Sequence, residues 1–185
     1  MSKEKCWLGF DVGKNGAICG ITSNGEITTQ VMPLVNEEIS LKTLADILEI
    51  YSEEYDIVCG VEDVHSIFGT SAKSNFQFGR SLGILEGFLA SKRLPFIKIA
   101  PKTWQKLCFM GISETRKPPT AEQIANAAKK QKTPQGSIDT KAMALLAAQR
   151  LFPKETFLAS SRSKKPHDGI VDALLIAYFL KCNYQ

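Results

Sequence analysis

Short apolar runs bounded by turn residues dominate the first hundred positions and predict strands. The first run, Trp7 to Val12, holds only apolar residues and glycine apart from Asp11, as is typical of a buried central strand. Asn24-Gly25 favours a hairpin turn, so the first three strands are expected to form an antiparallel meander. The predicted strands are 7–12, 17–21, 26–32, 57–64 and 96–100.

Apolar residues recurring every three or four positions predict five helices. Ser40 is a candidate N-cap for the first helix and Thr120 for the third. The rest of segment 101–135 is irregular and strongly basic. The predicted helices are 41–51, 76–91, 121–130, 138–151 and 167–181. This order predicts one α/β domain over residues 1–185, a five-stranded mixed sheet flanked by helices.

The predicted helix 76–91 carries glycine at every fourth position, at Gly79, Gly83 and Gly87. Each glycine inside a helix costs about 1 kcal/mol relative to alanine. A face made of three of them indicates close backbone approach to a sheet, a partner subunit or DNA. Packing on the sheet is the favoured interpretation.

Four carboxylates stand where an acid is unusual. Asp11 and Glu62 end apolar strands, while Asp168 and Asp172 lie four residues apart on the last, strongly apolar helix. Four acids that met would repel one another and would hold protons unless a cation joined them. Oxygen ligands without a cysteine cluster favour Mg²⁺, with Mn²⁺ as a substitute, and such ions can activate water at a phosphodiester. We hypothesise that the four acids meet around divalent metal.

Each acid taken alone also has a simpler explanation. Asp11 could begin a turn, Glu62 could lie at a strand edge, and Asp168 could cap its helix. Asp63 and Glu86 are expected to be structural, the latter as an ion-pair partner. The group of four is therefore more specific than any one of its members.

The net charge of +4 conceals an asymmetry along the chain. Residues 1–63 hold 4 Lys or Arg against 12 Asp or Glu, whereas residues 64–185 hold 19 against 7. An acidic half beside a basic half suits a metal site next to a polyanion, although lysines on solvated helix faces would give the same count.

Cysteine usage and hydropathy bear on the compartment. The five cysteines are odd in number and irregularly spaced, which predicts buried free thiols in a reducing compartment. No apolar run approaches the roughly 20 residues that span a membrane, and the N-terminus lacks a signal-peptide core. We expect a cytoplasmic protein, or one of an organelle matrix, without a membrane partner.

Several short motifs, spread over nearly the whole chain, resemble those of the RuvC-type Holliday-junction resolvases of the ribonuclease-H-like superfamily. They are Gly9-Phe10-Asp11-Val12-Gly13, Val61-Glu62-Asp63-Val64, Phe78-Gly79-Arg80-Ser81-Leu82-Gly83, Lys141 with Leu151-Phe152-Pro153, and the run from His167 to Ala177. The resemblance implies a ribonuclease-H-like fold and a homodimer that cuts two opposed strands of four-way junction DNA. The implied cuts leave 5′-phosphate and 3′-hydroxyl ends.

The resemblance also implies roles for individual residues. Lys141 would lie near the scissile phosphate with the four acids, and Lys106 is a weaker match for a second such lysine. Phe68 is our candidate for stacking at the opened junction centre, chosen over His65, Phe76 and Phe78 because its loop looks exposed. The expected phosphate contacts are Lys73, Arg80, Arg162, Lys164 and Lys165.

One departure and three rival interpretations accompany this hypothesis. The family usually spaces its last two acids three apart, so that Gly169 stands where the first would be and Asp168 is shifted by one. An actin-like ATPase also ends its first strand in Asp-x-Gly but needs two such domains. A non-catalytic DNA-binding protein, or another nuclease of this fold acting on RNA–DNA hybrids or branched DNA, would keep the same fold.

Overall fold

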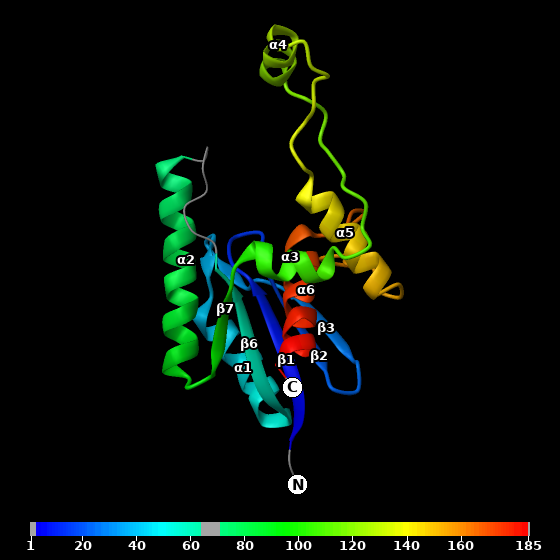
Figure 1. The fold of residues 1–185 in the computed structure, drawn as a ribbon. Helices are drawn as coiled ribbons and strands as arrows, with labels where there is room; N and C mark the ends of the chain where they lie inside the picture. Colours follow the sequence, from blue (N-terminus) through cyan, green and yellow to red (C-terminus); the bar gives the residue numbers. More distant parts are fainter. Residues whose placement is uncertain (1–2, 64–70, 185) are drawn as a thin grey trace.

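A five-stranded mixed sheet, with strand order β3-β2-β1-β6-β7, forms the centre of the molecule (Figure 1). The computed structural model describes residues 3–63 and 71–184. The strands are β1 Glu4–Asp11, β2 Ala17–Thr22, β3 Ile27–Val31, β6 Tyr55–Glu62 and β7 Phe96–Ile99. β1 pairs antiparallel with β2 and parallel with β6, β2 pairs antiparallel with β3, and β6 pairs parallel with β7. The predicted meander and its mixed sheet are confirmed.

Helices cover both faces of this sheet. They are α1 Leu41–Glu54, α2 Ala72–Ser91, α3 Pro101–Cys108, α4 Ala121–Lys129, α5 Thr140–Leu151 and α6 Asp168–Asn183. One core cluster joins α1 and α2 to the sheet through Leu44, Leu48, Leu85 and Leu89, and the other joins α3, α5 and α6 to the opposite face. The two predicted N-caps are confirmed, since Ser40 and Thr120 each accept a backbone N–H three residues on.

Three elements differ from the sequence prediction. Helix α2 begins within the predicted loop, because Ser71 accepts a hydrogen bond from the backbone N–H of Ser74 and caps the helix there. Helix α3 lies in the segment expected to be irregular; it starts at Pro101 and buries Trp104 and Cys108. A two-stranded hairpin, β4 Leu34–Val35 and β5 Glu38–Ile39, was not predicted because its strands are too short to show a period.

The glycine-rich face of α2 points away from the sheet. A Cβ atom added at Gly79, Gly83 or Gly87 would meet nothing within 4 Å among the residues that the structure describes. The sheet-facing positions of α2 are instead Leu85 and Leu89, which are fully buried. The expectation that the glycines pack on the sheet is therefore wrong.

The cysteine prediction is confirmed in part. All five cysteines are free thiols, and four are buried, but Cys182 is exposed near the end of α6. Within residues 3–63 and 71–184, no helix is long and apolar enough to cross a membrane.

Candidate active site

Strand alternation aims two of the four predicted acids at helix α6. In β1, Trp7 belongs to the core cluster beneath α6, whereas Leu8 and Phe10 belong to the cluster beneath α1 and α2. Since side chains alternate along a strand, Asp11 lies on the same face as Trp7. In β6, Val61 pairs in register with Phe10 and lies on the face of α1 and α2. The next residue, Glu62, therefore lies on the α6 face. Both acids therefore end adjacent parallel strands on one side of the sheet.

Two glycines let helix α6 approach this edge closely. A Cβ atom at Gly9 would lie 2.0 Å from the carbonyl oxygen of Ala173. A Cβ atom at Gly169 would lie 2.2 Å from the carbonyl oxygen of Asn15, in the turn that follows β1. Neither position accepts a side chain, so the start of α6, with its two acids, is held against the end of β1.

The four acids interact electrostatically. Burial raises the pKa of Asp11 well above its ordinary value, and the negative charges of Asp172, Glu62 and Asp168 raise it further while Lys141 opposes them. The pKa of Asp172 rises to about 7, mainly through burial and then through the charges of Glu62 and Asp168. The structure thus brings the predicted acids within electrostatic range of one another, and burial together with their mutual repulsion raises the pKa values of Asp11 and Asp172.

Trp104 fixes the orientation of one of these acids. Its indole Nε1 donates a hydrogen bond of 2.9 Å to Oε1 of Glu62, and its ring is fully buried on α3. Burial raises the pKa of Glu62, and this hydrogen bond opposes that rise because it favours the carboxylate. Sequence reasoning did not assign Trp104 a role, since nothing in the local pattern indicates which acid an indole will meet.

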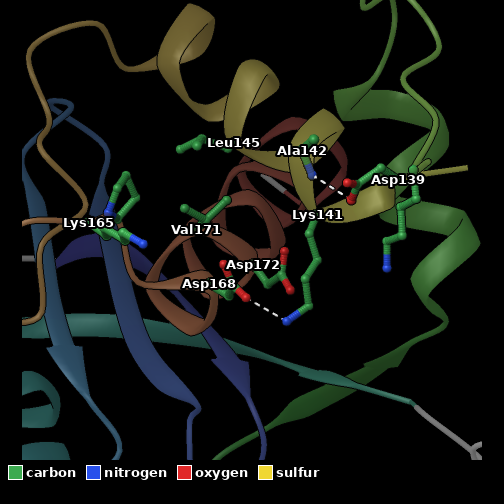
Figure 2. Close-up of a pocket in the computed structure, with 10 residues that line it drawn as sticks. Asp139, Lys141, Ala142, Leu145, Lys165, Asp168, Val171 and Asp172 are labelled. Carbon is green, nitrogen blue, oxygen red and sulfur yellow. Dashed lines mark hydrogen bonds and ion pairs between the residues drawn. The ribbon is translucent and has the colours of Figure 1, made fainter.

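Lys141 on α5 neutralises part of the negative charge. Its Nζ lies 2.5 Å from Oδ2 of Asp168, and this ion pair raises the pKa of the lysine (Figure 2). The two residues line a cavity of about 380 Å³ together with Asp172, Lys117 and Lys165. Three lysines from three separate segments therefore line one cavity with Asp168 and Asp172.

The donor set suits a hard divalent cation. Asp11, Glu62, Asp168 and Asp172 offer oxygen atoms, and three of them, Asp11, Glu62 and Asp172, have raised pKa values that a cation would lower again. In the part of the chain that the structure describes, no three His, Cys, Asp or Glu side chains come close enough together to hold one ion. The acids thus have the chemistry for a metal, but they stand wider apart than a coordination sphere.

The residues expected to contact DNA occupy different settings. Lys106, Arg162 and Lys164 are exposed, and Lys165 lines the cavity. Phe68 falls outside the described residues.

Two further candidates face the acidic turn of the β4–β5 hairpin. Arg80 donates hydrogen bonds from its two terminal guanidinium nitrogens, Nη1 and Nη2, to the carboxylate of Glu38. Lys73 helps to lower the pKa of Glu37, after the larger effect of a hydrogen bond from Lys14. These two basic side chains of α2 therefore have acidic partners within the chain.

Two expectations about neighbouring residues are resolved by the structure. Glu86 and Asp63 both pair with Lys98, at 2.9 Å and 3.2 Å, which confirms their structural role. Phe76 was not chosen as the stacking residue, yet it is 70% exposed on α2, which begins at Ala72. It is an exposed aromatic on the same chain segment as Phe68.

Comparison with solved structures places this architecture. Thermus thermophilus RuvC in complex with a Holliday junction substrate matches with a TM-score of 0.52 and 15% identity, over 95% of this chain and 92% of RuvC. The chain has the ribonuclease-H-like fold of RuvC. A second T. thermophilus RuvC structure gives 0.47 with 16% identity, over 96% and 95%. The yeast mitochondrial Holliday junction resolvase Ydc2 gives 0.46 with 16% identity, over 97% and 78%.

Comparison by sequence finds no match: no family model and no curated protein matches the chain. The likeness to RuvC therefore lies in the fold. What the chain does at its RuvC-like edge follows from its own residues.

Proposed function

We propose that the chain is a magnesium-dependent endonuclease that resolves four-way DNA junctions, with residues 1–185 acting as one nuclease domain. The observation that carries the proposal is the set of four acids, Asp11, Glu62, Asp168 and Asp172, at one edge of a RuvC-like sheet. The products would be 5′-phosphate and 3′-hydroxyl ends. Mn²⁺ would substitute for Mg²⁺ because both prefer carboxylate oxygens.

The four acids would hold the metal, which when bound would activate water and stabilise the leaving oxygen of a phosphodiester. The chain's own residues set up this chemistry. Trp104 holds Glu62 in one orientation, and Gly9 and Gly169 allow α6 to present its acids. The burial that raises the pKa of Asp11 and Asp172 makes their ionisation depend on a nearby cation.

Lys141 would serve the reacting phosphate. Both partners of its ion pair with Asp168 are exposed, Lys141 by 66% and Asp168 by 59% of the side chain, so an incoming phosphate can reach the ammonium group. The pKa of Lys141 is raised above its ordinary value, first by the hydrogen bond to Asp168, so the side chain is cationic at neutral pH as an ordinary lysine is. Lys165, on the same cavity, and the exposed Lys106, Arg162 and Lys164 would bind flanking phosphates, which gives affinity without sequence choice.

Junction binding also needs groups for the unpaired centre. Phe68 is the sequence-based candidate, and Phe76 is a second candidate because 70% of it is exposed at the start of α2. Stacking of a freed base on either ring would contribute roughly 1–3 kcal/mol. Lys73 and Arg80 would contact phosphates near this centre after exchanging their carboxylate partners on the β4–β5 hairpin.

We further propose that the active species is a homodimer. Paired cuts in opposed strands need two sites, and a twofold dimer supplies the second at fixed spacing. The exposed glycine face of α2 is the candidate interface, because it allows close backbone approach and nothing in the described chain covers it. A bulky charge at Gly83 would block such approach without disturbing the monomer core.

A panel of labelled substrates tests the function. Four-way junction, duplex, flap and RNA–DNA hybrid are incubated with and without Mg²⁺, using the wild type, Asp11→Asn and the control Asp56→Asn, an exposed acid at the opposite end of β6. We expect the wild type and Asp56→Asn to cut the four-way junction when Mg²⁺ is present, and Asp11→Asn not to cut it. Preferential cutting of the hybrid would identify a different nuclease of this fold, and tight junction binding without cutting would identify a non-catalytic binder.

A further inference from the structure

A long extension leaves the body of the molecule between α3 and α5. Residues 112–139, here called the arm, run out and back and carry α4 at their far end, well beyond the sheet edge that bears the acids (Figure 1). The sequence showed this segment as a basic stretch interrupted by prolines, with one predicted helix at 121–130. Ile112, at the start of the arm, is its contribution to the core clusters.

The base of the arm is firmly built. The backbone N–H of Lys117 donates to the carbonyl of Ser137 at 2.9 Å, and that of Asp139 donates to the carbonyl of Thr115 at 2.7 Å. Gly136 is buried between the two passes, where a Cβ atom would lie 1.7 Å from the carbonyl oxygen of Lys117. The arm therefore leaves the body in a fixed direction.

The tip has no core of its own. Helix α4 closes its N-terminus with a capping box between Thr120 and Gln123, and the backbone N–H of Lys132 closes its other end on Ala127. Every residue from 116 to 135 is exposed or half-buried. A nine-residue helix without packing is marginal in water, so a binding partner would stabilise it.

The charge of the arm identifies the kind of partner. Residues 112–139 hold five Lys or Arg against three acids, a net charge of +2, and the outer part, residues 116–132, holds the same five against one Glu, a net charge of +4. Three of the five, Lys129, Lys130 and Lys132, cluster at the end of α4 and in the turn after it, and all three are exposed. The large apolar side chain exposed there, Ile124, stands alone, which argues against a hydrophobic docking face.

The position of the arm connects it to the candidate active site. Lys117 and Asp139, at its base, line the same cavity as Asp168 and Asp172. The seven residues from Asp139 back to Lys132 span at most about 25 Å when extended. Duplex DNA rises about 3.4 Å per base pair, so this reach corresponds to at most about seven base pairs.

We propose that the arm is a second DNA contact, whose tip lysines bind backbone phosphates of a duplex arm up to about seven base pairs from the cleavage site. This inference rests on the proposed function, because it assumes that DNA enters the cavity at the base of the arm. The tip would give affinity and orientation for long duplex arms without reading sequence. Cleavage itself would be independent of it.

Two charge-matched variants test the inference. The tip variant is Lys129→Gln/Lys130→Gln/Lys132→Gln, and the control variant is Lys42→Gln/Lys92→Gln/Lys154→Gln, three exposed lysines outside the arm. Gln and Lys have similar helix propensities, so α4 keeps its intrinsic stability. Dissociation constants are measured over a salt series for junctions whose hairpin-closed arms are about 5 or about 20 base pairs long.

We expect the tip variant to bind the long-armed junction about ten- to a hundredfold more weakly and to lower the slope of log K against log salt by up to about 3. On the short-armed junction it should bind and cut like the wild type. The inference would be overturned if the tip variant bound the long-armed junction as tightly as the wild type does. Equal losses of affinity in the tip and control variants would overturn it too. If the wild type fails to prefer or cut junctions, the proposed function fails instead, and linear duplexes of the same two lengths then decide the role of the arm.

Discussion

Replacing Trp104 by Phe isolates the contribution of one hydrogen bond to the candidate active site. The indole Nε1 donates to Glu62 at 2.9 Å, and the ring is 1% exposed and packs edge-on against Phe109 with the centroids 5.9 Å apart. Phenylalanine keeps an aromatic ring in this space and removes the N–H. The carboxylate of Glu62 then loses the hydrogen bond that this indole donates and gains freedom to rotate.

The size of the effect follows from the charge of the acceptor. A hydrogen bond to a charged group contributes about 1.5–3 kcal/mol. If that energy serves to hold Glu62 in its working orientation, kcat/KM falls by about ten- to a hundredfold. The same bond lowers the pKa of Glu62, so its loss raises that pKa further and shifts the acidic limb of the pH–rate profile to higher pH.

Trp7 provides a matched control. It is the other tryptophan of the chain, is 5% exposed, and donates its Nε1 to the carbonyl of Tyr184 at 2.6 Å, at the opposite end of the sheet. Trp7→Phe should lower the melting temperature to a similar degree and leave the pH profile unchanged. Wild-type rate and pH profile in Trp104→Phe, or equal rate losses in both variants, would refute the positioning role.

Four further predictions concern the acids and the dimer. Asp11→Asn and Glu62→Gln should lower junction cutting by at least about a thousandfold, the scale of electrostatic groups in a site, while gel-shift affinity is kept or increased; wild-type cutting by either would contradict the assignment. Asp168→Asn should also cost most of the rate, and full activity would reduce it to a structural residue. Asp172 has a pKa of about 7 in the folded chain against an ordinary 3.8, so the metal-free free energy of unfolding should fall as pH rises between these values. Asp172→Asn should therefore raise the melting temperature at pH 8 but not near pH 4. In protein diluted until it is monomeric, Gly83→Ala should stabilise the chain by about 1 kcal/mol, because no described residue contacts this position. Gly83→Glu should yield a folded monomer in ultracentrifugation, and a Gly83→Glu variant that still dimerises would show that the interface lies elsewhere.

The sequence predicts most of the sheet because its strands are local patterns. The run up to Asp11 is continuously apolar, which predicts a buried strand ending at this acid, whereas the shared face of Asp11 and Glu62 follows only from the register between β1 and β6. Capping residues such as Ser40 and Thr120 locate helix starts for a similar reason, since the hydrogen bond spans only three residues. Features that depend on residues close together in the sequence can therefore be predicted without knowing the fold.

What the sequence does not reveal depends on distant contacts. The partner of Trp104 is 42 residues away, and no local signal connects the two. The glycines of α2 suggested packing, but spacing alone cannot tell a buried glycine face from an exposed one. The arm was visible as charge and proline, yet its projection from the body depends on Gly136 and the pairing at its base.

The central claim is paired, metal-dependent cutting of a four-way junction, and a supercoiled plasmid that extrudes a cruciform tests it most directly. Two coordinated cuts across the junction convert this plasmid to a linear molecule, whereas a single cut relaxes it to a nicked circle and removes the cruciform. With Mg²⁺ we predict linear product from the wild type and intact plasmid from Asp11→Asn. Nicked circles without linear product, or linear product from Asp11→Asn, would contradict the account.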